Sequence, residues 1–175
     1  MKSVFHGAYR REVFDKVGGF DERLGRTEDN EMHYRITKAG FKICYNPDII
    51  SYQHIRNNWR KMIKQKYENG YWIGLTLGIC PRCFSLYHFV PLYFVLMLFL
   101  LAILFFKGIK YPIILLFIIY FCVDIIMSFL AIIKEKKYWQ YVMLPIIFLS
   151  LHLSYGVGTL WGIIKMPFWK LKNSE

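Results

Sequence analysis

Two adjacent carboxylates, Glu28 and Asp29, have the residue types and the position in which a site could form. They fall in the first turn of a predicted short helix, which Thr27 can cap and Gly40 can stop. Acidic side chains in a first turn favour the helix dipole and require no other role. At 100° per residue, however, Asp29 shares the apolar face of this helix with Met32. A carboxylate on the buried side is costly, so its position favours a functional pocket as the alternative.

Two further groups could bind a metal ion or react. His54 ends a predicted strand, where it could be a metal ligand or an ordinary hydrogen-bonded side chain. Cys80 and Cys83 have the spacing of a zinc or redox motif. A zinc site needs four ligands, and no second pair of cysteines follows in this sequence, so we expect a structural role for both thiols.

The elements that must position the carboxylates are predicted to be helices and strands. Residues 9–17 read as a helix that glycines end, after which Phe20 folds back onto it. Residues 41–45 alternate apolar and polar side chains, which predicts a strand, and a turn follows at 46–48. Residues 50–54 alternate as a second strand. This mixture predicts an α/β fold for the part of the chain before residue 57.

Residues 57–77 are predicted to form an amphipathic helix. Its apolar stripe contains Trp59, Met62, Ile63 and Tyr67, and basic side chains cover the rest. Aromatic residues beside lysines, just ahead of an apolar segment, are typical of an interfacial helix that lies on lipid headgroups. Packing against the soluble part, with the basic side in water, is the alternative.

Three apolar segments are long enough to cross a bilayer, at about 83–106, 111–133 and 140–164. Asp124 interrupts the second segment, and we expect it to face a neighbouring helix rather than to mark a site. In the third, Ser154, Gly158 and Gly162 recur at a spacing that lets helices approach closely. The formal net charge of +11 could indicate a nucleic acid or an anionic membrane surface. Beside these apolar segments, membrane lipids are the expected partner and nucleic acid is not.

Residues 7–49, GAYRREVFDKVGGFDERLGRTEDNEMHYRITKAGFKICYNPDI, closely resemble the distal half of family-2 glycosyltransferases. The nearest type is the membrane-anchored enzyme of exopolysaccharide assembly, of the succinoglycan kind. The likeness continues through KQKY and GYW at 64–67 and 70–72, SLYHFVP at 85–91 and HLSYGVG at 152–158. In the helix of the first two motifs, Gln65 and Trp72 are the candidate acceptor or interface residues.

The resemblance implies a glycosyltransferase A-type fold and inverting transfer from a nucleotide-diphosphate sugar to a lipid-linked or polysaccharide acceptor. In this family the acid after the GGFDE loop is the general base, which matches Asp29, with Glu28 as its supporting partner. A divalent metal, magnesium or manganese, is expected in the complete enzyme. The expected location is the cell membrane, crossed several times, with the soluble part on the cytoplasmic side.

The sequence departs from the family in lacking any Asp-x-Asp motif, which in these enzymes lies with the sugar-nucleotide site in the preceding half. We therefore expect this chain to be the C-terminal part of a truncated or split enzyme, inactive alone and without a confidently bound cofactor. The missing half is then a required partner. A non-catalytic membrane fragment or an interaction subunit of a polysaccharide assembly complex is the alternative.

The expected organisation has four parts. They are the distal catalytic part at 1–56, an interfacial helix and hinge at 57–82, membrane helices at 83–165 and a tail at 166–175.

Overall fold

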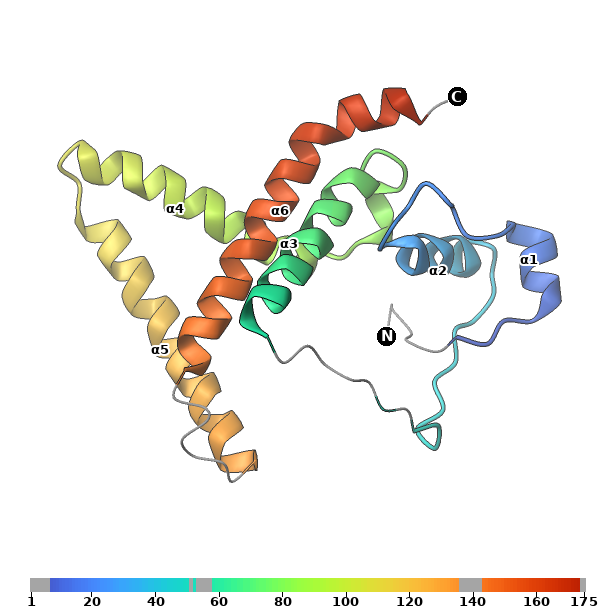
Figure 1. The fold of residues 1–175 in the computed structure, drawn as a ribbon, viewed down its shortest axis with the longest axis horizontal. Helices are drawn as coiled ribbons and strands as arrows, with labels where there is room; N and C mark the ends of the chain where they lie inside the picture. The colour runs from blue at the N-terminus through green and yellow to red at the C-terminus, as the bar shows by residue number, and fades with distance from the viewer. Residues whose placement is uncertain (1–6, 51, 53–57, 136–142, 174–175) are drawn as a thin grey trace.

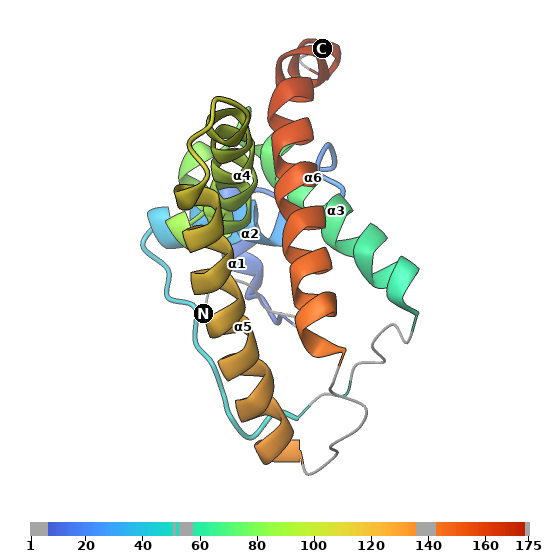
Figure 2. The same ribbon diagram turned by 90° about the vertical axis from the view of Figure 1, so that its left-hand side faces the viewer.

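The computed structural model describes residues 7–50, 52, 58–135 and 143–173, and every regular element in these ranges is helical (Figures 1 and 2). Two short helices come first, α1 (Arg11–Val17) and α2 (Glu28–Lys38). A longer helix, α3 (Trp59–Thr76), precedes two short 3₁₀ helices, Pro81–Cys83 and Leu86–Phe89. The long helices α4 (Val90–Phe106), α5 (Tyr111–Glu135) and α6 (Leu144–Lys172) follow.

A small apolar core joins α1 to α2. Val13, Met32 and Ile36 are its buried members, and the ring of Tyr9 packs against them. Phe20 returns onto this core, with its ring centre 5.9 Å from that of Tyr9 in an edge-on arrangement. The predicted fold-back after the first helix is therefore confirmed.

Helix α2 ends as the sequence predicts. Gly40 has φ +90°, a conformation that side-chain-bearing residues rarely adopt. Its N–H donates to the carbonyl of Thr37 at 3.1 Å, and the N–H of Phe41 donates to that of Ile36 at 3.2 Å. This pair of bonds satisfies the last carbonyls of the helix and turns the chain away from its axis.

The predicted α/β fold is wrong for the described residues, because no strand forms in them. Residues 41–46 have no regular structure, although the turn at 46–48 is present. Phe41 and Ile43 pack partly buried against the core of α1 and α2, whereas the described apolar side chains from Tyr45 onward stay exposed, from 68% for Tyr45 to 92% for Tyr52. A strand needs a neighbouring strand to bond its backbone, and the described part of the chain offers none. The alternation of apolar and polar residues is compatible with a strand, but it does not provide a neighbouring strand to pair with.

Helices α3 and α6 lie side by side and run in the same direction (Figures 1 and 2). The indole N–H of Trp59 donates to the hydroxyl of Ser150 at 3.1 Å, across a separation of 91 residues. One turn further along both helices, the hydroxyl of Ser154 donates to the carbonyl of Ile63 at 2.8 Å, across the same separation. The constant separation shows that the two helices stay in register.

Glycines bring the backbones of α3 and α6 together over the next two turns. A Cβ at Gly158 would lie 2.2 Å from the carbonyl oxygen of Tyr67, and one at Gly162 would lie 2.2 Å from that of Tyr71. The predicted small-residue face is therefore a close helix contact. Its partner is the amphipathic helix α3, which the sequence pattern does not identify.

Three helices are long and apolar enough to cross a membrane, by length and composition: Leu86–Phe106, Tyr111–Ile133 and Leu144–Lys172. They agree with the predicted number of spans. In Figure 1, α4 leads away from α6 and α5 returns toward it. Gly156 of α6 contacts α4, because a Cβ there would lie 2.2 Å from the carbonyl oxygen of Pro91.

Helix α5 carries polar side chains into this apolar assembly. Asp124 and Ser128 lie one turn apart and are 6% and 4% exposed. Neither carboxylate oxygen of Asp124 has a hydrogen-bond partner among the described residues. One turn earlier, the ring of Tyr120 lies against that of His152 on α6, with centres 5.8 Å apart. Asp124 thus occupies the face of α5 that turns toward α6.

Candidate active site

Asp29 lies half-buried in the first turn of α2, where the sequence predicts it. Its Oδ1 accepts the backbone N–H of Asn30 at 2.8 Å and the side-chain amide of Asn30 at 3.1 Å. Tyr9 approaches from the segment before α1. Its burial, and next the charge of Asp29, raise the pKa of the Tyr9 phenol. The carboxylate is therefore close enough to Tyr9, which packs on the core of α1 and α2, for its charge to act on the phenol.

His33 completes this group one turn after Asp29, on the same face of α2. It is only 4% exposed, and its Nε2 lies 2.8 Å from the hydroxyl of Tyr9. The phenol donates this bond when Nε2 is unprotonated and accepts it when Nε2 carries the proton. Tyr9, His33 and Asp29 thus make up a polar cluster at the start of α2.

Glu28 contributes an acceptor beside this cluster. Its side chain is half-buried, and its Oε2 is buried without a hydrogen-bond partner among the described residues. A buried carboxylate oxygen without a donor is costly unless a ligand supplies one. The two adjacent carboxylates therefore differ. Oδ1 of Asp29 accepts a hydrogen bond from Asn30, whereas Oε2 of Glu28 has no donor among the described residues.

The start of α2 is fixed to α3 by buried hydroxyls. Thr76 donates its hydroxyl proton to the carbonyl of Trp72 at 2.7 Å, so Thr27 donates to Thr76 Oγ1, at 2.5 Å. Thr27 makes no side-chain cap on α2, so the predicted capping role is wrong. The hydroxyl of Thr27 bonds Thr76 at the end of α3 instead of an N–H group at the start of α2.

Two further contacts fix the same loop. The guanidinium of Arg26 bonds the carboxylate of Glu68 and, at 3.0 Å, the amide oxygen of Asn69, both on α3. Gly25 lies so close to the ring of Trp72 that a Cβ would come within 2.5 Å of it. Since α3 packs along α6, these contacts give the candidate site a fixed position relative to the apolar helices.

Glu31 and Arg35, one turn apart on α2, form an ion pair. Glu31 is only 6% exposed, and Arg35 bonds its carboxylate through Nε and Nη2 at 2.7–2.9 Å. The same guanidinium donates to the carbonyls of Val17 and Gly19, at 2.7 Å for Gly19. Bonding to Glu31 raises the pKa of Arg35 further. The pair holds the end of α1 against α2 and thereby positions Tyr9.

The other predicted site residues lie elsewhere. Gln65 is half-buried on α3, and Trp72 packs its ring against Trp169 of α6, with centres 6.3 Å apart. His54 lies outside the described residues. Cys83 is buried, its thiol donates to the carbonyl of Cys80 at 3.0 Å, and burial raises its pKa.

A metal site does not emerge from the described residues. They contain no group of three or more His, Cys, Asp or Glu side chains that could hold an ion. The described residues alone thus offer no set of three such ligands for the divalent cation that the family resemblance implies.

Sequence reasoning missed Tyr9 and His33. A signal for His33 was available, because it follows Asp29 at the i+4 spacing that places side chains on one helix face. Tyr9 gave no comparable signal, since only the packing of α1 on α2 brings it to His33.

Comparison with known proteins shows what the chain resembles. A family model described as glycosyl transferase family group 2 matches residues 5–161. A dolichyl N-acetyl-α-D-glucosaminyl phosphate 3-β-D-2,3-diacetamido-2,3-dideoxy-β-D-glucuronosyltransferase of Methanococcus voltae is 30% identical over 146 residues, covering 83% of this chain and 42% of that protein.

Two further relatives match shorter stretches. The O-antigen chain rhamnosyltransferase WbaN of Salmonella anatum is 38% identical over 71 residues, covering 38% of this chain and 22% of its own length. The succinoglycan biosynthesis protein ExoA of Rhizobium meliloti (strain 1021) is 47% identical over 38 residues, covering 22% of this chain and 12% of its own length. The chain thus spans less than half the length of each of these relatives. No solved structure matches the chain.

Proposed function

This chain belongs to the family-2 glycosyltransferases, and we propose that it supplies the catalytic base and the membrane anchor of an enzyme that builds a polysaccharide or lipid-linked glycan. The observation that carries the proposal is the position of Asp29. The carboxylate lies close enough to Tyr9 for its charge to raise the pKa of the phenol, and it follows Glu28, whose Oε2 is buried without a donor among the described residues. Both stand on a helix whose start is bonded to α3 and hence to the apolar helices.

In the proposed reaction, Asp29 accepts the proton of the acceptor hydroxyl. The oxygen of that hydroxyl forms the new bond to the anomeric carbon of the donor sugar, while the bond from that carbon to the nucleotide diphosphate breaks and the diphosphate takes the electron pair. Attack from the opposite side inverts the configuration. A positioned general base of this kind contributes a rate factor of roughly 10²–10⁴.

The neighbours of Asp29 have supporting roles in this mechanism. Glu28 Oε2, buried and without a donor, can accept a second hydroxyl of the acceptor and so orient it. His33 and Tyr9 position the base, because their hydrogen bond fixes the wall of the site that faces Asp29. Gln65 and Trp72 remain proposed acceptor or interface residues on α3.

The complete enzyme needs more than the described residues provide. The nucleotide-diphosphate sugar and its divalent cation would bind mainly to a donor-binding segment that these residues do not include. The exposed apolar side chains at Tyr45, Ile49 and Ile50 are suited to pair with such a segment. The name of the Methanococcus voltae relative supports a phosphate-linked lipid glycan as the acceptor class.

We place the enzyme in the cell membrane, with α1 and α2 on the cytoplasmic side. Three apolar helices that are long enough to cross a membrane support the membrane part of this proposal.

The test is sugar transfer by the chain joined to the part of the Methanococcus voltae relative that it does not match. Membranes containing this fusion are incubated with radiolabelled nucleotide-diphosphate sugars, and label is counted in lipid and polysaccharide fractions. We expect Asp29→Asn to lower kcat about 10²–10⁴-fold. The matched control is Asp15→Asn, which removes an exposed carboxylate of α1 and should leave kcat unchanged.

Equal turnover in Asp29→Asn and in the parent fusion would remove Asp29 from the mechanism. A fusion that is well expressed in membranes but transfers none of the sugars would favour the alternative of a non-catalytic subunit.

A further inference from the structure

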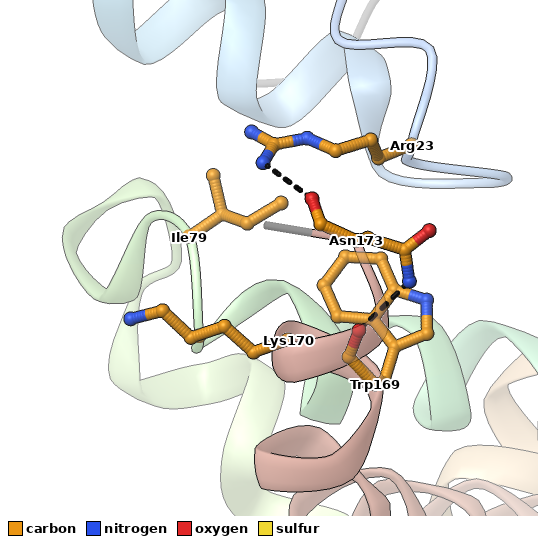
Figure 3. A pocket seen from close by; sticks show the side chains of 6 residues that line it. Arg23, Ile79, Trp169, Lys170 and Asn173 are labelled. Carbon is orange, nitrogen blue, oxygen red and sulfur yellow. Dashed lines mark hydrogen bonds between the residues drawn. The ribbon is translucent and has the colours of Figure 1, made fainter. Parts of the chain in front are cut away.

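A pocket of about 270 Å³, which Asp29 does not line, lies where three separate segments meet (Figure 3). The segments are the loop between α1 and α2, the turn after α3 and the last turn of α6. The lining residues are Arg23, Gly78, Ile79, Trp169, Lys170 and Asn173.

Arg23 lines this pocket, and hydrogen bonds hold its guanidinium on two sides. Its Nε and Nη2 bond the two carboxylate oxygens of Asp21 at 2.9 and 2.7 Å, and Nη1 donates to the backbone carbonyl of Asn173 at 3.3 Å (Figure 3). A guanidinium has five N–H groups, so two remain for a ligand. The bond to Asn173 also satisfies a carbonyl at the end of α6, which reduces the negative partial charge there.

Lys170 supplies the second cation. Its side chain is exposed, and no acceptor among the described residues bonds its ammonium group. With Asp21 compensating Arg23, this ammonium leaves the pocket with one positive charge in excess. In Figure 3 the two cationic side chains come from different elements, with Ile79 between them.

The remaining wall is apolar and aromatic. The indole of Trp169 packs edge-on against Trp72, with ring centres 6.3 Å apart, so it cannot swing away freely. The pocket lies at the end of α6, a helix long and apolar enough to cross a membrane. Tryptophan and lysine at the end of a span are typical of the headgroup depth of a bilayer.

We propose that this pocket binds a phosphate group, either that of an anionic lipid headgroup or free phosphate. The guanidinium and ammonium groups bond the phosphate oxygens, and the faces of Trp169 and Ile79 contact the apolar part that adjoins the phosphate in a lipid. The site depends on the position of α6 in a membrane and not on glycosyl transfer by Asp29. Phosphate binding can therefore be measured whether or not the chain takes part in glycosyl transfer.

The test uses the full chain purified in detergent and the ligand-dependent rise in its thermal unfolding temperature. The probes are dihexanoyl phosphatidic acid, dihexanoyl phosphatidylcholine and inorganic phosphate. We expect phosphatidic acid to raise the unfolding temperature and phosphatidylcholine to have little effect. Lys170→Gln should weaken the apparent affinity for phosphatidic acid about 10-fold or more, since it removes a charged hydrogen bond. Lys170→Arg should retain it.

The matched control is Lys172→Gln, which removes a neighbouring exposed lysine that does not line the pocket. Inorganic phosphate that saturates with an affinity similar to that of phosphatidic acid identifies free phosphate as the ligand. Response to the lipid alone identifies the headgroup. Equal affinities of the parent and Lys170→Gln, or equal responses to the two lipids, would overturn the proposal.

Discussion

The hydroxyl groups of Thr27 and Thr76 lie 2.5 Å apart and are both buried, and they join the start of α2 to the end of α3. The residues are separated by 49 positions in the chain, and one immediately precedes the candidate carboxylates. Because α3 packs along α6, this bond belongs to the path by which the apolar helices position Asp29.

Replacing Thr76 by valine should destabilise the chain by about 1–3 kcal/mol, because the buried hydroxyl of Thr27 then loses its acceptor. Unfolding by denaturant in detergent gives this value. The double variant Thr27→Val/Thr76→Val should recover most of the loss, since neither position then holds an unpaired hydroxyl. Additive losses in the double variant would show that the two hydroxyls are not coupled.

Replacing Gly158 by alanine should separate α3 from α6. The new methyl group would lie 2.2 Å from the carbonyl oxygen of Tyr67, so the backbones must shift, at a cost of roughly 1–3 kcal/mol. A lower unfolding temperature and faster proteolysis of α3 are the expected readouts. Gly19→Ala is the control, because no atom lies within 4 Å of its added Cβ. A Gly158→Ala protein as stable as this control would contradict the close packing.

Replacing Tyr9 by phenylalanine should destabilise the small core by about 0.5–1.5 kcal/mol, through loss of the hydrogen bond to His33. In the active fusion it should also lower kcat, because the hydrogen bond between Tyr9 and His33 is proposed to position the base. Tyr45→Phe, at an exposed position, should match the parent in both measurements. An unchanged kcat in Tyr9→Phe would limit this bond to a structural role.

Replacing Asp124 by leucine should leave stability in detergent unchanged or higher, by up to about 1–3 kcal/mol. The buried carboxylate has no hydrogen-bond donor among the described residues, so its removal relieves a cost without breaking a pair. Thermal unfolding of the variant measures the sign. A clear fall in the unfolding temperature would mean that Asp124 bonds a partner, such as water or another chain. Ser128→Ala serves as the comparison on the same face.

Acidification should loosen the loop before α2. The hydrogen bonds with Arg23 lower the pKa of Asp21 in the folded chain. A lowered folded pKa means that the carboxylate contributes stability above its unfolded pKa of about 3.9 and loses it as the pH falls through the lower folded value. The stability difference between the parent and Asp21→Asn should therefore be largest near neutral pH and shrink as the pH approaches 3. A stability difference that grows as the pH falls would contradict the lowered pKa of Asp21 in the folded chain.

The sequence was most informative where the physical cause is local. The end of α2 at Gly40 depends on one residue that tolerates a positive φ, and the apolar helices depend on length and composition. The strand at 41–45 was predicted from a pattern that is equally local, but a strand exists only with a neighbour. Residues 51, 53 and 54 of the second predicted strand lie outside the described residues. Thr27 shows the same limit, because a hydroxyl suited to capping a helix bonds another helix instead.

By itself, the sequence determined the helices that carry the site, the apolar segments, the resemblance to a glycosyltransferase family and the identity of Asp29 as the candidate base. The tertiary structure decided which groups surround that base and where it lies relative to the apolar helices. Tyr9, His33 and Asp29 come together because α1 packs on α2, and Arg23 meets Asn173 because α3 and α6 run in register. Such contacts depend on the distance between elements, which residue spacing along one element does not encode.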